Sequence, residues 1–339
     1  MDDRRFPWAV ASWTGVGSYP WEDPDEAART VFGELTQLPH LPELPARGAG
    51  ADIIGRTASL LVDIPVEVQP TGWRVARGPG RDLARAGSFL SYDLEAVERH
   101  GAAYTGPFKV QAAGPWTLAA SVELRSGERM LGDRGAVADL AASLAEGVRA
   151  HIADVAARLP GAELIVQIDE PSLPAVLAGR VPTASGYRRI AAPDPALARE
   201  RLGEVFAAVE EAGALPAAHC CAEDAPIGLL RRSGARALGL DAARLTSGSD
   251  EAVGEAVEAG AGLFLGVAAR ARAGVSDPVG TVDPVRELWN RIGFAPESLA
   301  GTVVVTPVCG LAGASPEGAR AALDACREAA RVLRDDPRG

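Results

Sequence analysis

The chain has 339 residues, of which 47% are hydrophobic and 23% charged, a composition typical of a folded globular protein and not of a disordered one. Lys and Arg number 34 against 45 Asp and Glu, and the formal charge of −11 argues against nucleic acid and membrane surfaces as partners. The apolar stretches are shorter than the roughly 20 residues that span a bilayer, and the start lacks a signal-peptide core, so we expect a cytoplasmic protein.

Short β-rich runs alternate with Ala-rich stretches of helical length along the whole chain. The runs that predict strands are Trp8–Trp13, Ile64–Gln69, Phe108–Ala113, Leu164–Ile168, Leu215–His219, Ala237–Leu240, Gly262–Val267 and Thr302–Val308. The stretches that predict helices are Pro24–Gln37, Ala51–Leu61, Asp93–His100, Gly135–Leu159, Pro195–Ala212, Pro226–Ser233, Asp250–Glu258, Asp283–Ile292 and Ser315–Arg334.

This alternation predicts an α/β protein with eight strand and helix pairs, which favours a (β/α)8 or TIM barrel formed by residues 1–339 as a single domain. A doubly wound sheet is the alternative. In a barrel, the active site lies on the loops at the C-terminal ends of the strands. The residues that follow each predicted strand are therefore the candidates for a functional site.

Three of the four cysteines and one histidine follow predicted strands. His219 and Cys221 are two residues apart after the fifth strand, so their side chains point to the same side and can share one ion. Cys309 follows the eighth strand, which can face the fifth across the narrow mouth of a closed barrel. Two thiolates and an imidazole favour zinc over magnesium or calcium. Asp241 is the natural candidate for a fourth ligand, and an N-cap role for Asp241 and a structural role for the other residues are the alternatives.

Carboxylates and a glycine-rich turn follow two other predicted strands. Asp169 and Glu170 end a buried run, where a carboxylate can bind a substrate cation; we favour this role for Asp169 over helix capping and leave Glu170 undecided. The turn Gly15-Val16-Gly17-Ser18 lets backbone N–H groups approach a ligand carboxylate, and Ser18 adds a hydroxyl donor. A tight turn without a ligand is the alternative, and Pro20 argues against a dinucleotide-binding fingerprint.

Five motifs together resemble a known family. In chain order they are V-G-S-Y-P, G-P-W-T-L, Q-I-D-E-P-S-L, H-x-C and P-V-C-G-L, and they resemble the catalytic C-terminal barrel of cobalamin-independent methionine synthase over nearly the whole chain. The resemblance implies a (β/α)8 barrel and a methyltransferase that moves a methyl group to the thiol of homocysteine to form methionine. It implies zinc held by His219, Cys221 and Cys309, with Asp241 near the position of the family's glutamate.

The same resemblance implies roles for the residues around the substrate. Asp169 would bind the homocysteine ammonium as a catalytic residue, and Ser18 would bind the carboxylate end. Trp116 is the candidate substitute for the family's aromatic platform, because Ser121 stands near the usual place. Zinc coordination would keep the substrate thiol as the nucleophilic thiolate at neutral pH.

Two departures from the family bear on the methyl donor. The chain is too short for the family's additional N-terminal barrel, so we expect a short single-barrel form. After the seventh strand the family has a D-x-H motif whose His protonates the folate, whereas residues 265–269 here read L-G-V-A-A. A methylcorrinoid donor needs no proton, so we expect methylcobalamin, free or carried by a corrinoid protein, to serve better than methyltetrahydrofolate. Methyl transfer to another thiol, such as coenzyme M, and a zinc-binding homologue without activity are the alternatives.

Overall fold

The computed structural model describes residues 6–268 and 278–339, and its centre is a parallel sheet of six strands in the order β3-β4-β5-β6-β7-β8. The strands are β3 (Pro107–Ala113), β4 (Glu163–Asp169), β5 (Leu215–His219), β6 (Ala237–Asp241), β7 (Gly262–Ala268) and β8 (Val303–Pro307). Every neighbouring pair is parallel, so the C-terminal ends of all six strands lie at the same edge of the sheet.

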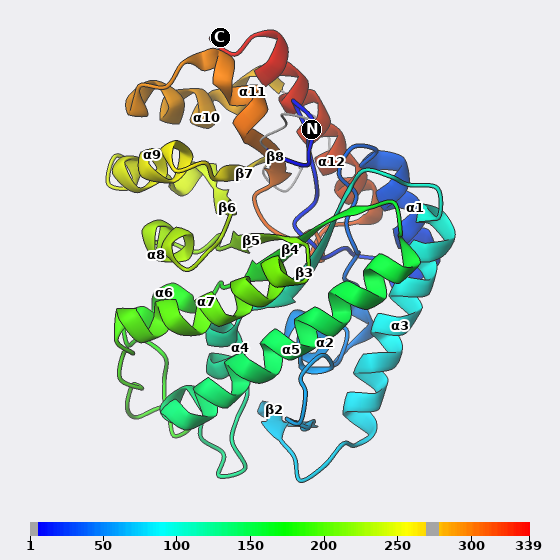
Figure 1. Ribbon diagram of the computed structural model, residues 1–339, viewed down its shortest axis with the longest axis vertical. Coiled ribbons are helices and arrows are strands. Elements are labelled where there is room, and N and C mark those ends of the chain that lie inside the picture. Colours follow the sequence, from blue (N-terminus) through cyan, green and yellow to red (C-terminus); the bar gives the residue numbers. More distant parts are fainter. Residues whose placement is uncertain (1–5, 269–277) are drawn as a thin grey trace.

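Helices lie around the sheet, and eight of them form a closed ring (Figure 1). In chain order the ring consists of α1 (Pro24–Glu34), α3 (Arg81–Gly101), α5 (Arg134–Arg158), α7 (Pro195–Glu211), α8 (Ile227–Arg232), α9 (Asp250–Glu258), α10 (Pro278–Ile292) and α12 (Pro316–Asp335). Each packs against the next, and α12 returns to pack against α1.

The other helices lie in the loops that join these elements. They are α2 (Ile53–Ala58), α4 (Pro115–Ser121), α6 (Leu173–Leu177), α11 (Leu299–Thr302) and the 3-10 turns η1 (Pro45–Arg47), η2 (Met130–Gly132), η3 (Ala242–Arg244) and η4 (Pro296–Ser298). Both α2 and α4 lie near the C-terminal edge of the sheet. Helix α4 follows β3 directly in the chain, and α2 reaches the same end of β3, where Ala113 N donates to Thr57 Oγ1 at 2.7 Å. None of the described helices is long and apolar enough to cross a lipid bilayer.

The second expected strand is not part of the central sheet. It corresponds to β1 (Val66–Gln69), which pairs antiparallel with β2 (Gly72–Val75) in a separate hairpin. The residues between the two strands are Pro70 and Thr71, and Gly72 adopts a φ of 127°, which residues with a side chain rarely tolerate. This turn chemistry folds the run back on itself instead of letting it continue across the sheet.

The first expected strand is also reduced, and short segments lie at both edges of the sheet instead. Trp13 forms a single parallel bridge to Val305 of β8, and His40 forms one to Lys109 of β3. A further bridge joins Ser18 to Glu43, so these two segments contact each other. The fold is therefore TIM-barrel-like, with six strands in a curled sheet and bridged segments between its edges.

Prolines explain why the segment around His40 stays short. Pro39 and Pro42 flank it, and a proline has no backbone N–H to give to a ladder of hydrogen bonds. Hydrogen bonds run from Leu41 N to Lys109 O and from Lys109 N to Pro39 O on the β3 side, and from Glu43 N to Gly17 O and Tyr19 N to Glu43 O on the other side.

The N-terminal end of the sheet is filled by apolar side chains. Trp8 stacks on Phe6 at 4.5 Å between ring centroids and meets the edge of Phe264 at 5.0 Å. These rings belong to a small cluster of buried residues that includes Ile165 of β4 and Val304 of β8. Polar residues of the sheet interior are consequently gathered toward the opposite, C-terminal end.

Candidate active site

A cavity of about 370 Å³ lies at the C-terminal ends of the strands. It brings together five of the residues that the sequence singles out, namely Ser18, Asp169, His219, Cys221 and Cys309. A larger cavity of about 610 Å³ lies at the other ends of β4 and β5, but none of these residues lines it. The smaller cavity is therefore the candidate active site.

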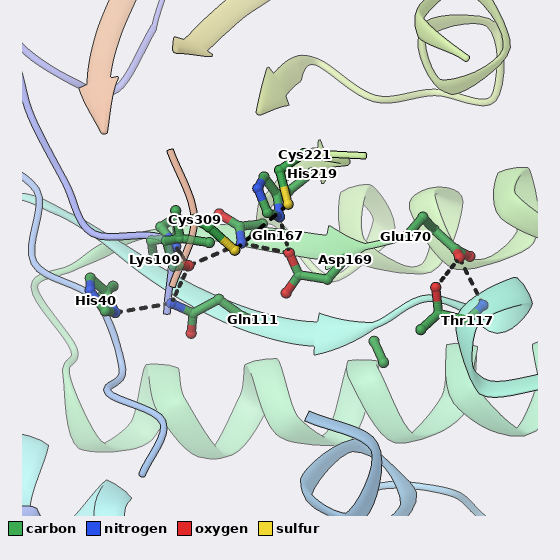
Figure 2. A network of polar contacts seen from close by, with 12 residues as sticks. His40, Lys109, Gln111, Thr117, Gln167, Asp169, Glu170, His219, Cys221 and Cys309 are labelled. Atoms are coloured by element: carbon green, nitrogen blue, oxygen red, sulfur yellow. Dashed lines mark hydrogen bonds and ion pairs between the residues drawn. The ribbon is translucent and has the colours of Figure 1, made fainter. Parts of the chain in front are cut away.

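The two thiols of this cavity are close neighbours although 88 positions separate them in the chain. Cys221 follows β5 and Cys309 follows β8, and their Sγ atoms are 3.8 Å apart (Figure 2). Contact with the Cys309 thiol, together with burial, raises the pKa of Cys221. Two thiolates at this distance repel each other, so a cation between them would be needed to hold both in the charged form.

His219 and Asp169 form a hydrogen-bonded pair beside the thiols. They face each other across the register of β4 and β5, and His219 Nδ1 donates to Asp169 Oδ1 at 2.8 Å. The Asp169 side chain is only 6% exposed. Because Nδ1 carries the shared proton, the lone pair of the imidazole is on Nε2, the arrangement typical of a histidine that ligates a metal.

The thiol spacing fits a tetrahedral metal site. Two sulfurs bound at about 2.3 Å to one zinc ion lie about 3.8 Å apart at the tetrahedral angle, and the observed separation is 3.8 Å. Among residues 6–268 and 278–339, however, no group of three or more His, Cys, Asp or Glu side chains is arranged to hold a metal ion. The donor types and the thiol pair thus fit zinc, whereas the complete ligand set is not assembled.

Asp241 is not brought to this cavity. Its Oδ1 accepts from Ala243 N at 3.0 Å and its Oδ2 from Arg244 Nε at 3.1 Å, so the carboxylate caps η3 as the N-cap alternative describes. It lines a separate cavity of about 290 Å³ between the ends of β5 and β6. The structure therefore groups His219, Cys221 and Cys309 without Asp241.

Trp116 does not line the cavity either. The side chain is 1% exposed within α4, and its indole Nε1 donates to the carbonyl oxygen of Ala198 in α7 at 3.1 Å. A buried indole whose N–H is satisfied by the neighbouring helix is a packing residue in this structure. The expected aromatic platform for a substrate is consequently not at this position.

Glu170, which the sequence left undecided, points away from Asp169 (Figure 2). Its carboxylate accepts from Trp116 N at 2.9 Å, from Thr117 N at 2.8 Å and from Thr117 Oγ1 at 2.7 Å. Burial raises the pKa of Glu170 to about 7, and these hydrogen bonds oppose that rise. Glu170 therefore caps the N-terminus of α4 from outside the helix, whereas the neighbouring Asp169 pairs with His219 at the cavity.

The turn that carries Ser18 lies against the end of β8. Leu311 N donates to Ser18 O at 2.7 Å, and a Cβ atom on Gly310 would lie 2.1 Å from Ser18 Oγ. A Cβ on Gly15 would lie 2.4 Å from His40 Nε2. Both glycines are thus required by close approach, and Gly310 leaves the Ser18 hydroxyl beside the cavity.

Two buried charged residues of the site were missed by the sequence reasoning. Glu43 is 6% exposed and lines the cavity, its Oε1 has no hydrogen-bond partner among the described residues, and burial raises its pKa to about 7. Lys109 is fully buried, donates to Val16 O at 2.8 Å, and has its pKa lowered to about 7 by burial. The signal that would have found them is a charged residue inside an apolar run, which normally marks function or a partner.

Comparison with known proteins agrees with the family resemblance of the sequence motifs. Residues 11–332 match the family model described as the catalytic domain of cobalamin-independent synthase. No curated protein matches the chain.

One solved structure shares the fold. A B12-independent methionine synthase from Shewanella sp. W3-18-1, in complex with selenomethionine, is 13% identical with a TM-score of 0.61, and the match covers 97% of this chain and 99% of that one. A 2,3-dimethylmalate lyase is 13% identical over 97% of this chain and 84% of that one, but its TM-score of 0.36 is too low to support a conclusion.

Proposed function

The chain belongs to the family of the cobalamin-independent synthase catalytic domain, a family of methyltransferases, and we propose that it transfers a methyl group to the thiol of homocysteine to form methionine. The observation that carries this proposal is the cavity lined by two thiols 3.8 Å apart together with Asp169 and Ser18. We further propose that residues 1–339 act as a single (β/α)8 barrel domain.

We propose that His219, Cys221 and Cys309 hold a zinc ion. When bound, zinc would keep the substrate thiol in its thiolate form at neutral pH. Asp169 supports this site by accepting the Nδ1 proton of His219, which leaves Nε2 free to ligate. Asp241 can be the fourth ligand only by leaving Ala243 and Arg244, so the zinc affinity of an Asp241→Asn variant tests that role.

The charged ends of homocysteine match the charged and polar groups of the cavity. Asp169 Oδ2 and Glu43 offer carboxylate oxygens to the substrate ammonium, since the two protein donors near Asp169 both bind Oδ1. Ser18 offers its hydroxyl to the carboxylate end. Anchoring both ends holds the substrate sulfur in line with the incoming methyl group, so catalysis is mainly by positioning.

This pair of carboxylates also selects among thiols. Coenzyme M carries a sulfonate and no ammonium, so Glu43 and Asp169 would repel it instead of pairing with it. Homocysteine is therefore favoured over that alternative.

The methyl donor has two candidates. The family's description as cobalamin-independent favours methyltetrahydrofolate. Against it, residues 269–277, which follow β7 in the chain, include no histidine to protonate the folate. Asp277 is the candidate for a substitute proton donor, and both Ala269 and Asp277 lie outside the described residues. Loss of a general acid typically costs about 10² to 10⁴ in rate, so we propose methylcobalamin, free or on a corrinoid protein, as the better donor.

Elemental analysis and a side-by-side assay test the proposal. We expect about one zinc per chain and methionine formation from homocysteine, faster with methylcobalamin than with methyltetrahydrofolate. Turnover with the folate alone would reverse the donor assignment. Zinc binding without methionine formation from either donor would favour the inactive zinc-binding homologue, and absence of zinc would overturn the proposed metal site.

A further inference from the structure

A chain of hydrogen bonds runs beneath the cavity and involves one side chain that the proposed function does not use. Gln167 Nε2 lies 3.0 Å from Val16 O and 2.8 Å from Asp169 Oδ1 (Figure 2). The same Oδ1 accepts from His219 Nδ1 at 2.8 Å. The amide of Gln167 therefore links the Gly15 to Ser18 turn to the pair formed by Asp169 and His219.

The strand geometry explains why Gln167 is in this place. Side chains two positions apart on a strand point to the same side, so Ile165, Gln167 and Asp169 of β4 all face the interior of the curled sheet. Ile165 packs in the apolar cluster at the N-terminal end, and Asp169 reaches the cavity at the other end. Gln167 lies between them, is 3% exposed and does not line the cavity, so it cannot touch a substrate held there.

The amide group is suited to this link in a way that other side chains are not. Its NH2 has two hydrogens, one for each of two acceptors that are 151 and 2 positions away in the chain. A carboxylate in the same place would put acceptor against acceptor, and an apolar side chain would leave Asp169 Oδ1 with one donor fewer. Lys109, which also donates to Val16 O, holds the turn but makes no hydrogen bond to Asp169 among the described residues.

We propose that Gln167 is a positioning residue that couples the two ends of the substrate site to the metal ligand His219. It holds the turn so that Ser18 faces the carboxylate end, and it turns Asp169 so that Oδ1 orients His219 while Oδ2 is left for the ammonium. This inference rests on the proposed function for the identity of the ligands, but the link itself does not depend on them.

Two variants and a matched control test the proposal. Gln167→Met keeps the volume and removes both donors, and Gln167→Glu keeps the shape and replaces the donors by acceptors. Gln69→Met is the control, because Gln69 Nε2 also donates to a carboxylate, that of Glu67 at 3.0 Å, but in the hairpin away from the cavity. Zinc affinity is measured by chelator competition, and homocysteine binding by calorimetry on the zinc-loaded protein.

We expect both Gln167 variants to bind zinc and homocysteine about 10- to 100-fold more weakly than the wild type, as is usual when a group behind a metal ligand is removed. The control should match the wild type. Affinities of folded Gln167 variants within about two-fold of the wild type would overturn the proposal. Failure of both variants to fold, with the control folded, would also overturn it, since the amide would then serve the fold and not the site.

A ligand-free measurement separates this inference from the proposed function. The turn is fastened by hydrogen bonds from Tyr19 N to Glu43 O and from Glu43 N to Gly17 O, so these amides report on its stability. We expect their hydrogen exchange to be about ten-fold faster in Gln167→Met than in the wild type or the control. If the wild type binds neither zinc nor homocysteine, the proposed function fails, while unchanged exchange at these amides would refute the link through Gln167.

Discussion

Single residues around the cavity differ in how well the protein itself satisfies them. Asp169 Oδ1 accepts two hydrogen bonds, from Gln167 and His219, whereas Glu43 Oε1 accepts none among the described residues. A buried carboxylate oxygen without a donor costs free energy that a cationic ligand can recover. Glu43 is therefore a residue whose burial a ligand ammonium can make less unfavourable.

We predict that Glu43→Gln weakens homocysteine binding. The change removes the charge that pairs with the substrate ammonium and keeps the shape, at a cost of about 1.5 to 3 kcal/mol, or roughly ten- to hundred-fold in affinity. Calorimetry on the zinc-loaded protein measures this. An unchanged Kd would show that the Glu43 carboxylate does not bind the substrate ammonium.

The titration of Glu43 should make homocysteine binding depend on pH. Burial raises the pKa of Glu43 to about 7, with Asp169 adding to the rise and Arg56 and Lys109 opposing it. Glu43 is ionised above that pH and neutral below it, so homocysteine affinity should fall as the pH drops through about 7. The slope should be flatter in Glu43→Gln, and an equal slope in both proteins would assign it to another group.

We predict that Asp169→Asn weakens the binding of both homocysteine and zinc. From the sequence, only substrate binding should suffer, with zinc content unchanged. In the structure Asp169 also accepts the Nδ1 proton of His219, so we expect zinc affinity to fall about 10- to 100-fold as well. Chelator competition measures it, and unaltered zinc affinity would show that His219 is oriented without this carboxylate.

At the scale of elements, α4 depends on a cap that comes from another strand. The helix begins at Pro115, and its Gly114 N-cap has no side chain to accept the first N–H groups. Glu170 of the loop after β4 accepts two of them, and a Cβ on Gly114 would lie 2.3 Å from Glu170 Oε1. Gly114 therefore leaves the space that the Glu170 carboxylate needs to cap the helix.

We predict that Glu170→Gln lowers the free energy of unfolding by about 1 to 3 kcal/mol at acidic pH, because an amide NH2 would face the helix N–H donors. The raised pKa means that the folded protein holds the Glu170 proton more tightly than the unfolded chain. Wild-type stability from this group therefore falls as the pH rises from 4.5 to about 7, and the difference from the variant narrows over that range.

Urea unfolding over this pH range is the measurement for that prediction. Glu163→Gln, an exposed position at the start of β4, is the matched control and should leave stability nearly unchanged. A difference between wild type and Glu170→Gln that stays constant with pH would argue that Glu170 does not titrate in this range.

For the whole molecule, the proposed metal site joins the fifth and eighth strands across the opening of the curled sheet. Cys221 and Cys309 belong to these two strand ends, and the helix ring behind them closes from α12 to α1. A ligand that binds only the folded protein stabilises it by about 2.7 kcal/mol at a hundred-fold excess over its Kd. Zinc should therefore raise the Tm by several degrees, and a chelator should reverse the rise.

Scanning calorimetry with and without zinc checks this prediction. Magnesium should have no effect, because thiolates and imidazole select soft metals. Cys309→Ala should remove most of the zinc-dependent shift while leaving the metal-free Tm close to that of the wild type. A full shift in that variant would place the zinc at another set of residues.

The sequence by itself determined most strands and helices, because the spacing of apolar residues within each short segment indicates which of the two it forms. Strands β3 to β8 lie where short apolar runs predict them, and α9 begins and ends at the expected residues, Asp250 and Glu258. It also indicated which residues follow strands, and this sufficed to group His219, Cys221 and Cys309, because parallel strands bring their C-terminal ends to one edge.

Only the tertiary structure decided which partner each polar group takes. Cys221 meets Cys309 across 88 positions and Asp169 meets His219 across 50, whereas Asp241 turns to neighbours only two and three positions away. Local pattern specifies the face on which a side chain stands, but a carboxylate or amide there has several acceptable partners within reach. The partner that it binds is set by the distances that the packed sheet and helices impose, because a hydrogen bond weakens when the donor–acceptor distance lengthens by a few tenths of an ångström.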